Sequence, residues 1–505
     1  MLPDEIIAEI FLHCLPREYG RGASLNPKEA PVLLTHVCQR WRIIAVNEGR
    51  LWAALRFRPT PEFVAGNPRL LLILAISALQ RCKGCKHSVE LHFADGFNSL
   101  PSDTLSIPLQ PFLLLDTSLA TLALRNVRLK EMVNLRRGLF PALESLALSF
   151  RGQGVRVNNP KTEAWVISAF EDAPNLHRVA FNTETLDESI DVQLSLPWNQ
   201  ITHLLYISNQ PTLHSIYKDR LPAATQLRYL SIHPGYDDYA DSEAKVLGNI
   251  PSVTQYERLE WLSLDCWAAD IAVIYPLFLE YAAFPSLKKL RISGPPWDFV
   301  EYRSFWPTGL KDRFIAKLRD LTHLEYFSLD VGDTSPATLV DVFSSIPKVK
   351  TLDLYIFENY QFVFEALTHS EDPANSLLPH LSTLTIEASR CQAHEDLSDP
   401  ESEDQDYDPQ PIDAGVFQTF LESRTRCPEE FRLRKVVVYG TRTKDLDETA
   451  VDFIRCLNGF RSRGLEVDLR HVVAVARSGV RAFSHNLWLD RDPIFEQWPE
   501  ARIID

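Results

Sequence analysis

The phrases FPALESLAL (140–148), FPSLKKLRI (284–292), IPKVKTLDL (346–354) and LPHLSTLTI (378–386) are near-copies of one another. Each phrase ends in an apolar residue, two variable residues, an apolar residue, one variable residue and a last apolar residue. The alternation at the end is typical of a short strand with one buried face. Proline stops a preceding helix because it lacks an N–H donor and restricts the residue before it. The phrase therefore predicts a helix stop followed by a buried strand.

The same six-residue pattern recurs through most of the chain. Its clearest copies begin at Leu119, Leu143, Leu176, Ile201, Leu227, Leu259, Leu287, Leu324, Val349 and Leu381. Weaker copies begin at Ser88, Leu433 and Leu465. The clear copies are spaced by about 29 residues on average, at the upper edge of the leucine-rich repeat range of about 20–29. This period predicts stacked strand-plus-helix units with one continuous core.

The stretches between copies, such as 162–172 and 337–345, are predicted as helices on the outer side of the stack. We therefore expect an α/β fold, in which a small all-α N-terminal region precedes a leucine-rich-repeat solenoid with a curved parallel sheet inside and helices outside.

Composition excludes several classes of function. The chain has 505 residues, with 52 basic and 67 acidic side chains and a net charge of −15. Nucleic-acid binding calls for a basic surface, so we expect no nucleic acid as a partner. No apolar run approaches the roughly 20 residues that span a bilayer, so we expect no membrane association. The carboxylates of Asp4, Glu5 and Glu9 argue against a secretory signal, and the eight cysteines have no disulfide-framework spacing. The expected location is the cytoplasm, the nucleus or both.

The first 58 residues lack the repeat phrase and are predicted as helices. One begins at Leu2-Pro3-Asp4-Glu5, with proline near the first turn and two carboxylates at the positive helix end. A second is expected from about Pro31 to Asn47. Two short helices with large apolar faces bury little by themselves, which indicates that a partner protein completes their core.

Three segments of this region resemble an F-box: LPDEIIAEIF (2–11), LLTHVCQRWRIIA (33–45) and LWAAL (51–55). F-box proteins with leucine-rich repeats are substrate receptors of SCF-type cullin–RING ubiquitin ligases. The resemblance implies that the F-box binds the Skp adaptor, and through it cullin, while the repeats bind a protein substrate. It also implies a non-catalytic subunit that is monomeric within the complex. The positions that it assigns to Skp binding are Leu2, Pro3, Ile6, Ile7, Ile10, Phe11, Leu34, Val37, Cys38 and Trp41.

The resemblance and the repeats together divide the chain. We expect an F-box at 1–58, a connecting helix with the N-terminal end of the solenoid at 59–118, the solenoid at 119–470 and a C-terminal cap at 471–505. A disordered acidic loop is expected at 395–413, because like charges at that density repel one another. The alternatives there are a docking strip for a basic partner and phosphorylation at Ser398 and Ser402.

Side chains on the solvent side of the repeat strands are the candidate substrate-binding residues. They lie just before, between and after the last two apolar positions of each copy, where alternation points them away from the core. Over five adjacent copies they include aromatic and charged residues typical of binding surfaces. These residues are Tyr229, His233, Trp261, Asp265, Lys289, Arg291, Tyr326, Asp330, Asp353 and Tyr355.

Catalytic motifs are absent from the sequence, and we predict neither enzyme activity, nor a cofactor, nor a metal site. The pair Cys82 and Cys85, near His87 and His92, leaves zinc binding and thiol redox chemistry open beside ordinary cysteines at a helix end. The rival to the ligase interpretation is a plain interaction scaffold, in which the N-terminal helices only cap the solenoid.

Overall fold

The structure is a computed structural model of the chain. It describes residues 2–16, 23–57, 68–82, 84–92, 118–150, 164–183, 186, 190–208, 220–234, 253–265, 278, 282–293, 310–330, 335–355, 360–370, 376–387, 413–440 and 448–471. The predicted acidic loop at 395–413, apart from Asp413, and the predicted cap at 471–505, apart from His471, lie outside these residues.

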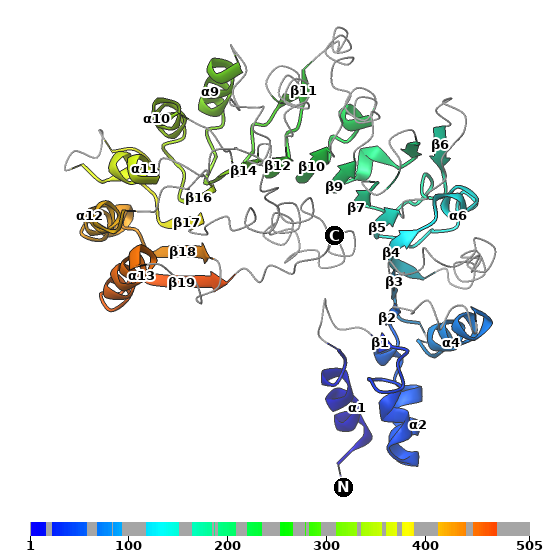
Figure 1. Ribbon diagram of the computed structural model, residues 1–505. Coiled ribbons are helices and arrows are strands. Elements are labelled where there is room, and N and C mark those ends of the chain that lie inside the picture. The colour runs from blue at the N-terminus through cyan, green and yellow to red at the C-terminus, as the bar shows by residue number, and fades with distance from the viewer. Residues whose placement is uncertain are drawn as a thin grey trace, which may run out of the picture. The chain divides into compact units, whose positions relative to one another are not determined.

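The chain forms two compact units, with the main boundary between Leu227 and Arg228 inside the predicted solenoid (Figure 1). In unit 1 the parallel strands follow the order β1 (Ala23–Ser24), β2 (Ala54–Phe57), β3 (His87–His92), β4 (Leu119–Val127), β5 (Ser145–Phe150), β7 (Arg178–Asn182) and β9 (His203–Ser208). In unit 2 the parallel order is β10 (Tyr229–Pro234), β12 (Trp261–Asp265), β14 (Lys289–Ser293), β15 (Tyr326–Asp330), β16 (Thr351–Tyr355), β17 (Thr383–Glu387), β18 (Lys435–Gly440) and β19 (Glu466–His471).

Helices connect many of these strands. Unit 1 contains α1 (Asp4–His13), α2 (Gln39–Asn47), α4 (Pro68–Arg81) and the short α6 (Leu129–Val133). Unit 2 contains α9 (Leu310–Asp320), α10 (Pro336–Ser345), α11 (Tyr360–Leu367), α12 (Ala414–Thr425) and α13 (Glu448–Arg461). Figure 1 shows α9 to α13 in a row along the outer side of the unit 2 sheet. The mixed α/β class and the parallel sheet are therefore confirmed.

A strand is present at each of the ten clear copies of the sequence phrase, and β3, β18 and β19 are present at the weaker copies. The apolar positions pair in register across strands, as in the series Leu262, Leu290 and Phe327. These three side chains are at most 1% exposed. Their alignment builds a continuous core from one strand to the next, because parallel pairing places equivalent residues side by side.

The proline of each phrase lies in a tight turn that precedes the strand. The N–H of Leu287 donates to the carbonyl of Phe284 at 3.2 Å, and the N–H of Val349 donates to the carbonyl of Ile346 at 3.1 Å. Proline is favoured at the second position of such a turn because its φ angle is already correct. The recurring proline therefore ends one connection and sets the start of the next strand.

Two predicted helices are wrong in detail. Residues Ala164–Ile167 form β6, which pairs in parallel with β8 (Asp191–Leu194) as a separate two-stranded sheet. Tertiary pairing overrides the helical pattern there, since Trp165, Val166 and Ile167 are residue types that fit strands. The expected helix over 31–47 is instead a short 3₁₀ helix, η1 (Leu33–His36), followed by α2. Cys38 adopts an extended conformation between them, and its Sγ accepts the Trp41 N–H at 3.5 Å.

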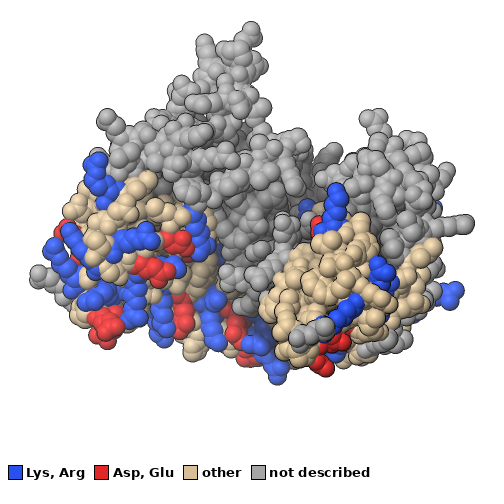
Figure 2. Space-filling model, turned by 90° about the horizontal axis from the view of Figure 1, so that it is seen from below, with Lys and Arg blue, Asp and Glu red and all other residues tan. Residues whose placement is uncertain are grey.

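Alternating charges follow the edge of the unit 2 sheet where the strands begin. Arg228 and Lys288 both contact Glu260, at 2.7 and 3.3 Å, and Lys350 contacts Glu325 at 2.9 Å. The hydrogen bond from Arg228 lowers the pKa of Glu260 below its ordinary value. Figure 2 shows basic and acidic side chains interleaved on the part of this surface where they are coloured. Pairs this exposed contribute little stability each, about 0–1 kcal/mol.

A half-buried carboxylate in unit 1 makes stability depend on pH. Burial raises the pKa of Glu131, in α6, to about 7, although the charge of Arg128 opposes the shift. As pH rises from 4.5 to 7, the unfolded chain loses this proton while the folded chain retains it, so the group increasingly destabilises the fold. We expect Glu131→Gln to raise the free energy of unfolding by about 1–2 kcal/mol at pH 8 and by less at pH 5. Thermal denaturation at the two pH values measures this, and an equal effect at both would contradict the assignment.

Candidate partner-binding surfaces

The N-terminal helical region, residues 2–57, is not all-α as expected, because it also contributes β1 and β2 to the parallel sheet. Its helices have a small interior of their own. Phe11 from α1 and Trp41 from α2 meet edge to face, with ring centroids 4.9 Å apart. Phe11 is 1% exposed, and Ile7 and Leu34 are also buried. Three of the residues assigned to Skp binding by resemblance therefore belong to the interior, while Trp41 is half-buried beside them.

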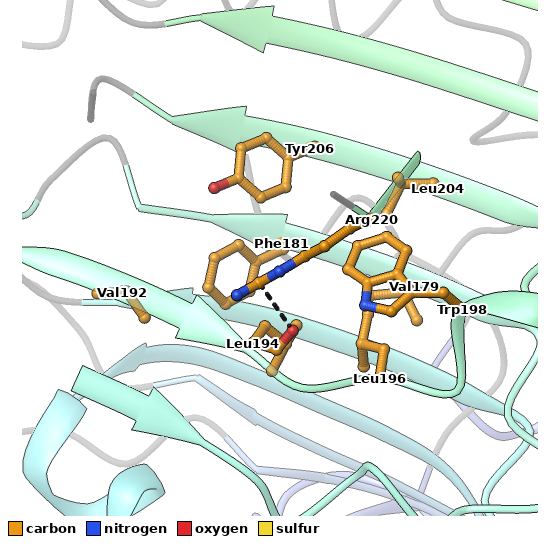
Figure 3. Close-up of a pocket in the computed structure, with 9 residues that line it drawn as sticks. All are labelled: Val179, Phe181, Val192, Leu194, Leu196, Trp198, Leu204, Tyr206 and Arg220. Atoms are coloured by element: carbon orange, nitrogen blue, oxygen red, sulfur yellow. Dashed lines mark hydrogen bonds between the residues drawn. The ribbon is translucent and has the colours of Figure 1, made fainter. Parts of the chain in front are cut away.

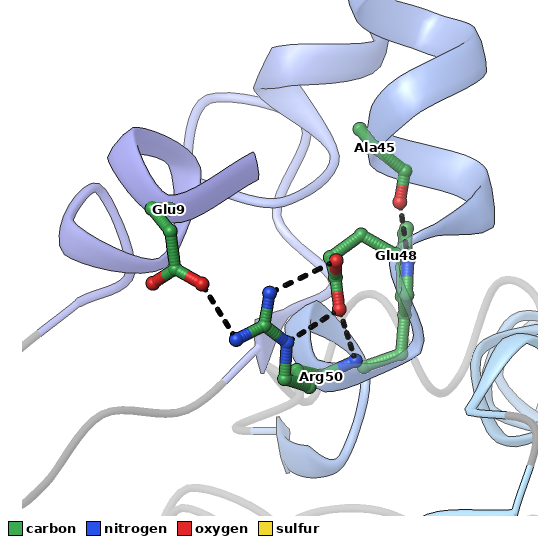
Figure 4. Close-up of polar contacts among 5 residues, drawn as sticks. Glu9, Ala45, Glu48 and Arg50 are labelled. Carbon is green, nitrogen blue, oxygen red and sulfur yellow. Dashed lines mark hydrogen bonds and ion pairs between the residues drawn. The ribbon is translucent and has the colours of Figure 1, made fainter. Parts of the chain in front are cut away.

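Two arginines hold this region together from the outside. Arg40, in α2, donates to the Leu2 carbonyl and to Asp4, both at 2.6 Å, and so ties the start of α1 to the start of α2. Arg50 lies in the 3₁₀ helix η2 (Gly49–Leu51) and bonds Glu9 of α1 at 2.7 Å and Glu48 at 2.8 Å (Figure 4). The hydrogen bond from Arg50 also lowers the pKa of Glu48. Both contacts fix how α1 lies against α2.

The outer surface of the same helices carries a group of apolar side chains, here called the N-terminal apolar surface. Its members are between 44% and 55% exposed: Leu2, Ile6, Ile10, Leu33, Val37 and Ile43. Ile6 and Ile10 are four residues apart in α1, which places them along one side of that helix, and Leu2 lies just before it. In Figure 2 the N-terminal helices are mostly tan, with few charged side chains. Such a concentration of exposed apolar residues is typical of a protein-binding surface.

This surface contains some of the predicted Skp-binding residues and two that sequence reasoning missed. Leu2, Ile6, Ile10 and Val37 are members, and Pro3 and Cys38 are exposed beside them. Leu33 and Ile43 were not predicted. The available signal was their apolar character within the segment LLTHVCQRWRIIA (33–45).

The segment LWAAL (51–55), the last of the three that resemble an F-box, packs against the rest of unit 1. Trp52 is 1% exposed, and its indole N–H donates to the Ala45 carbonyl at 2.8 Å. The Arg81 guanidinium, at the end of α4, lies 4.6 Å from the Trp52 ring centroid. Trp52 therefore connects α2 with α4.

In unit 2 the predicted substrate-binding residues do share one face of the sheet. Tyr229, Trp261, Lys289 and Tyr326 occupy one register position on successive strands. The Tyr229 and Trp261 rings are stacked with centroids 5.7 Å apart, and the Trp261 and Tyr326 rings with centroids 5.3 Å apart. The Lys289 ammonium lies 4.8 Å from the Trp261 ring centroid, a cation–π contact. Strand alternation was sufficient to predict this grouping.

These side chains were expected to face solvent, but several of them are buried. Tyr229 and Trp261 are 5% exposed, and His233 and Arg291 are at most 1% exposed. Lys289, Tyr326 and Asp353 are half-buried. The Trp261 ring stacks on Tyr229 of the adjacent strand and on Tyr326 two strands away, which covers part of each ring and is not revealed by a strand pattern. The side chains of Asp265, Asp330 and Tyr355 lie outside the described residues.

Polar contacts on this face fix several side chains. The Tyr326 hydroxyl donates to Asp353 Oδ2 at 2.5 Å, across adjacent strands. His233 Nε2 and Ser231 Oγ are 2.7 Å apart on one strand. Side chains held in this way are ordered before any ligand arrives, so this part of the face is preorganised.

A small pocket in unit 1 has a different character (Figure 3). It is lined by Val179, Phe181, Val192, Leu194, Leu196, Trp198, Leu204, Tyr206 and Arg220. Arg220 extends over Phe181 and donates to the Leu194 carbonyl at 3.1 Å. The lining includes no carboxylate, histidine or cysteine, so it offers no acid–base or nucleophilic pair for catalysis.

Within the described residues, no group of three or more His, Cys, Asp or Glu side chains is placed to share a metal ion. None of the helices that the structure describes is both long and apolar enough to cross a membrane. Comparisons with known protein families and with curated proteins find no match for this chain.

Proposed function

We propose that this protein is the substrate-recognition subunit of an SCF-type cullin–RING ubiquitin ligase. In this proposal residues 2–57 bind the Skp adaptor through the N-terminal apolar surface. The half-buried side chains of Lys289, Tyr326 and Asp353, on one face of the unit 2 sheet, bind a protein substrate. The chain itself performs no chemistry. It holds a substrate lysine near the charged ubiquitin-conjugating enzyme and so raises the effective concentration of the two reactants.

The observation that carries the proposal is the division of the N-terminal helices into two sides. Their inner side is filled by Phe11, Ile7 and Leu34, whereas their outer side exposes six large aliphatic residues. Complete burial of one such side chain is worth about 1.5–3 kcal/mol, so covering the group supplies ample driving force for a complex. The F-box resemblance supplies the identity of the partner.

A charge placed on this surface should prevent adaptor binding without unfolding the chain. Ile6 is 48% exposed, so Ile6→Asp removes little from the folded core. In a complex, the new carboxylate would be buried without a partner, which costs several kcal/mol. We expect co-purification with a recombinant Skp adaptor to weaken by at least about 100-fold.

Ile73→Asp is the matched control, because Ile73 is 57% exposed and lies in α4, outside the N-terminal apolar surface. That variant should bind the adaptor like the unaltered chain. If both variants bind equally well, or if the unaltered chain does not bind, the ligase proposal is wrong and the interaction-scaffold interpretation replaces it.

A further inference from the structure

The pair Cys82 and Cys85 forms a site whose chemistry the proposed function leaves unused. Cys82 directly follows α4, and its N–H donates to the Leu79 carbonyl at 3.1 Å. The N–H of Cys85 donates back to the Cys82 carbonyl at 3.1 Å. The two cysteines are thus the ends of a four-residue turn, and Gly84 within it has φ of 77°, a value that glycine adopts without strain.

The backbone of this turn suits a disulfide. Cys82 and Cys85 are both free thiols in the structure. The end residues of such a turn have Cα atoms less than about 7 Å apart. A disulfide requires a Cα separation of about 4.4–6.8 Å. The turn therefore holds the two Cα atoms within the range that a disulfide spans.

We propose that Cys82 and Cys85 form a reversible intramolecular disulfide by exchange with a small disulfide such as oxidised glutathione. Cys85, which is partly exposed, attacks first as its thiolate and displaces one glutathione thiolate from the oxidant. Cys82, which is 0% exposed, then loses its proton and attacks the Cys85 sulfur, which releases the second glutathione. Two protein thiols are oxidised, one glutathione disulfide is reduced, and the two protons pass to the two glutathione thiolates.

The surroundings identify a stoichiometric redox site rather than a dithiol oxidoreductase. Oxidoreductase cysteines are activated at the N-terminal end of a helix, where N–H groups stabilise a thiolate. This pair lies at the C-terminal end of α4, and burial raises the pKa of the Cys82 thiol to about 12. We therefore expect the Cys82–Cys85 disulfide to form slowly, and to form faster as pH rises.

The turn also contacts the N-terminal helical region. A Cβ at Gly49, in η2, would lie only 3.1 Å from the Cys82 carbonyl oxygen. Together with Arg81 over Trp52, this places the thiol pair at the joint between residues 2–57 and α4. The inference does not depend on adaptor binding, so either proposal can fail without the other.

The test uses the reduced full chain in mixtures of reduced and oxidised glutathione, followed by alkylation and mass spectrometry. Trypsin cleaves after Lys83, so an internal disulfide leaves the Cys82 and Cys85 peptides linked. We expect Cys82 and Cys85 to lose reactivity together and to recover it together in dithiothreitol. Retention of both thiols in oxidised glutathione, or a bond from Cys85 to another cysteine, would overturn the proposal.

Two variants make the assignment specific. In Cys82→Ser the reaction should stop at glutathione bound to Cys85, with at least about a 10-fold rise in that mixed disulfide. Cys14→Ser is the control, because Cys14 is an exposed thiol in α1's C-terminal cap and should not affect the Cys82–Cys85 disulfide. An unaltered amount of mixed disulfide at Cys85 in Cys82→Ser would show that Cys82 does not resolve it.

Discussion

Replacement of Arg424 by methionine should lower the free energy of unfolding by about 3–5 kcal/mol, since each orphaned buried carbonyl costs about 1–3 kcal/mol. Arg424 lies in α12 and is 0% exposed. Its guanidinium donates to the carbonyls of Leu367 at 2.7 Å, Leu377 at 2.6 Å and Leu378 at 3.0 Å. Leu367 is the last residue of α11, where carbonyls lack helical partners. Methionine fills much of the space but donates no hydrogen bond.

Burial lowers the pKa of Arg424 to about 10, so the side chain still carries its charge at neutral pH. Arg426→Met is the matched control, because that side chain is 75% exposed and its ion pair with Glu422 spans one helical turn. We expect the control to change stability by less than about 0.5 kcal/mol. Urea denaturation measures both variants, and equal stability of the two would show that the three carbonyl contacts carry no net free energy.

Truncation of Trp52 to alanine should destabilise residues 2–57 by about 3–5 kcal/mol, the usual cost of removing a buried aromatic side chain. Trp52 supplies the packing between α2 and α4, the hydrogen bond to Ala45 and the contact with Arg81. The loss should be local at first, so limited proteolysis should cut within the N-terminal region before unit 2 is attacked.

Trp52→Phe separates packing from hydrogen bonding. Phenylalanine keeps most of the buried area but leaves the Ala45 carbonyl without the indole donor, so we expect a smaller loss of about 1–2 kcal/mol. If Trp52→Ala and the unaltered chain are cleaved at the same rate, Trp52 does not hold this joint.

The sequence was most informative where one local rule is repeated many times. The phrase that includes Leu287, Leu290 and Ile292 predicted a strand with one buried side, and the structure confirms both at β14. The helix stop expected before it is wrong, because a two-residue strand, Ala282–Ala283, and a tight turn precede β14 instead. The sequence was least informative where contacts with distant segments decide the role of a side chain. Arg424 looks like an ordinary helix residue in the sequence, because the carbonyls that it binds lie 46 to 57 residues away.

The candidate surfaces show the same contrast. Alternation correctly grouped Tyr229, Trp261 and Tyr326 on one face, but it did not reveal that their rings stack and bury one another. On the N-terminal helices, a pattern of apolar residues could not separate the interior Phe11 from the exposed Ile10, since both fit the same amphipathic helix. Only the position of α2 against α1 decides which of them is left open to a partner.

The most direct test of the ligase-receptor account is hydrogen exchange of the full chain, alone and with a recombinant Skp adaptor. The account predicts a one-to-one complex in which amide exchange slows in α1, η1 and α2. The strands β14 to β16, assigned to substrate, should exchange at the same rate with and without the adaptor. Absence of a complex, or slowing confined to the unit 2 strands, would contradict the account.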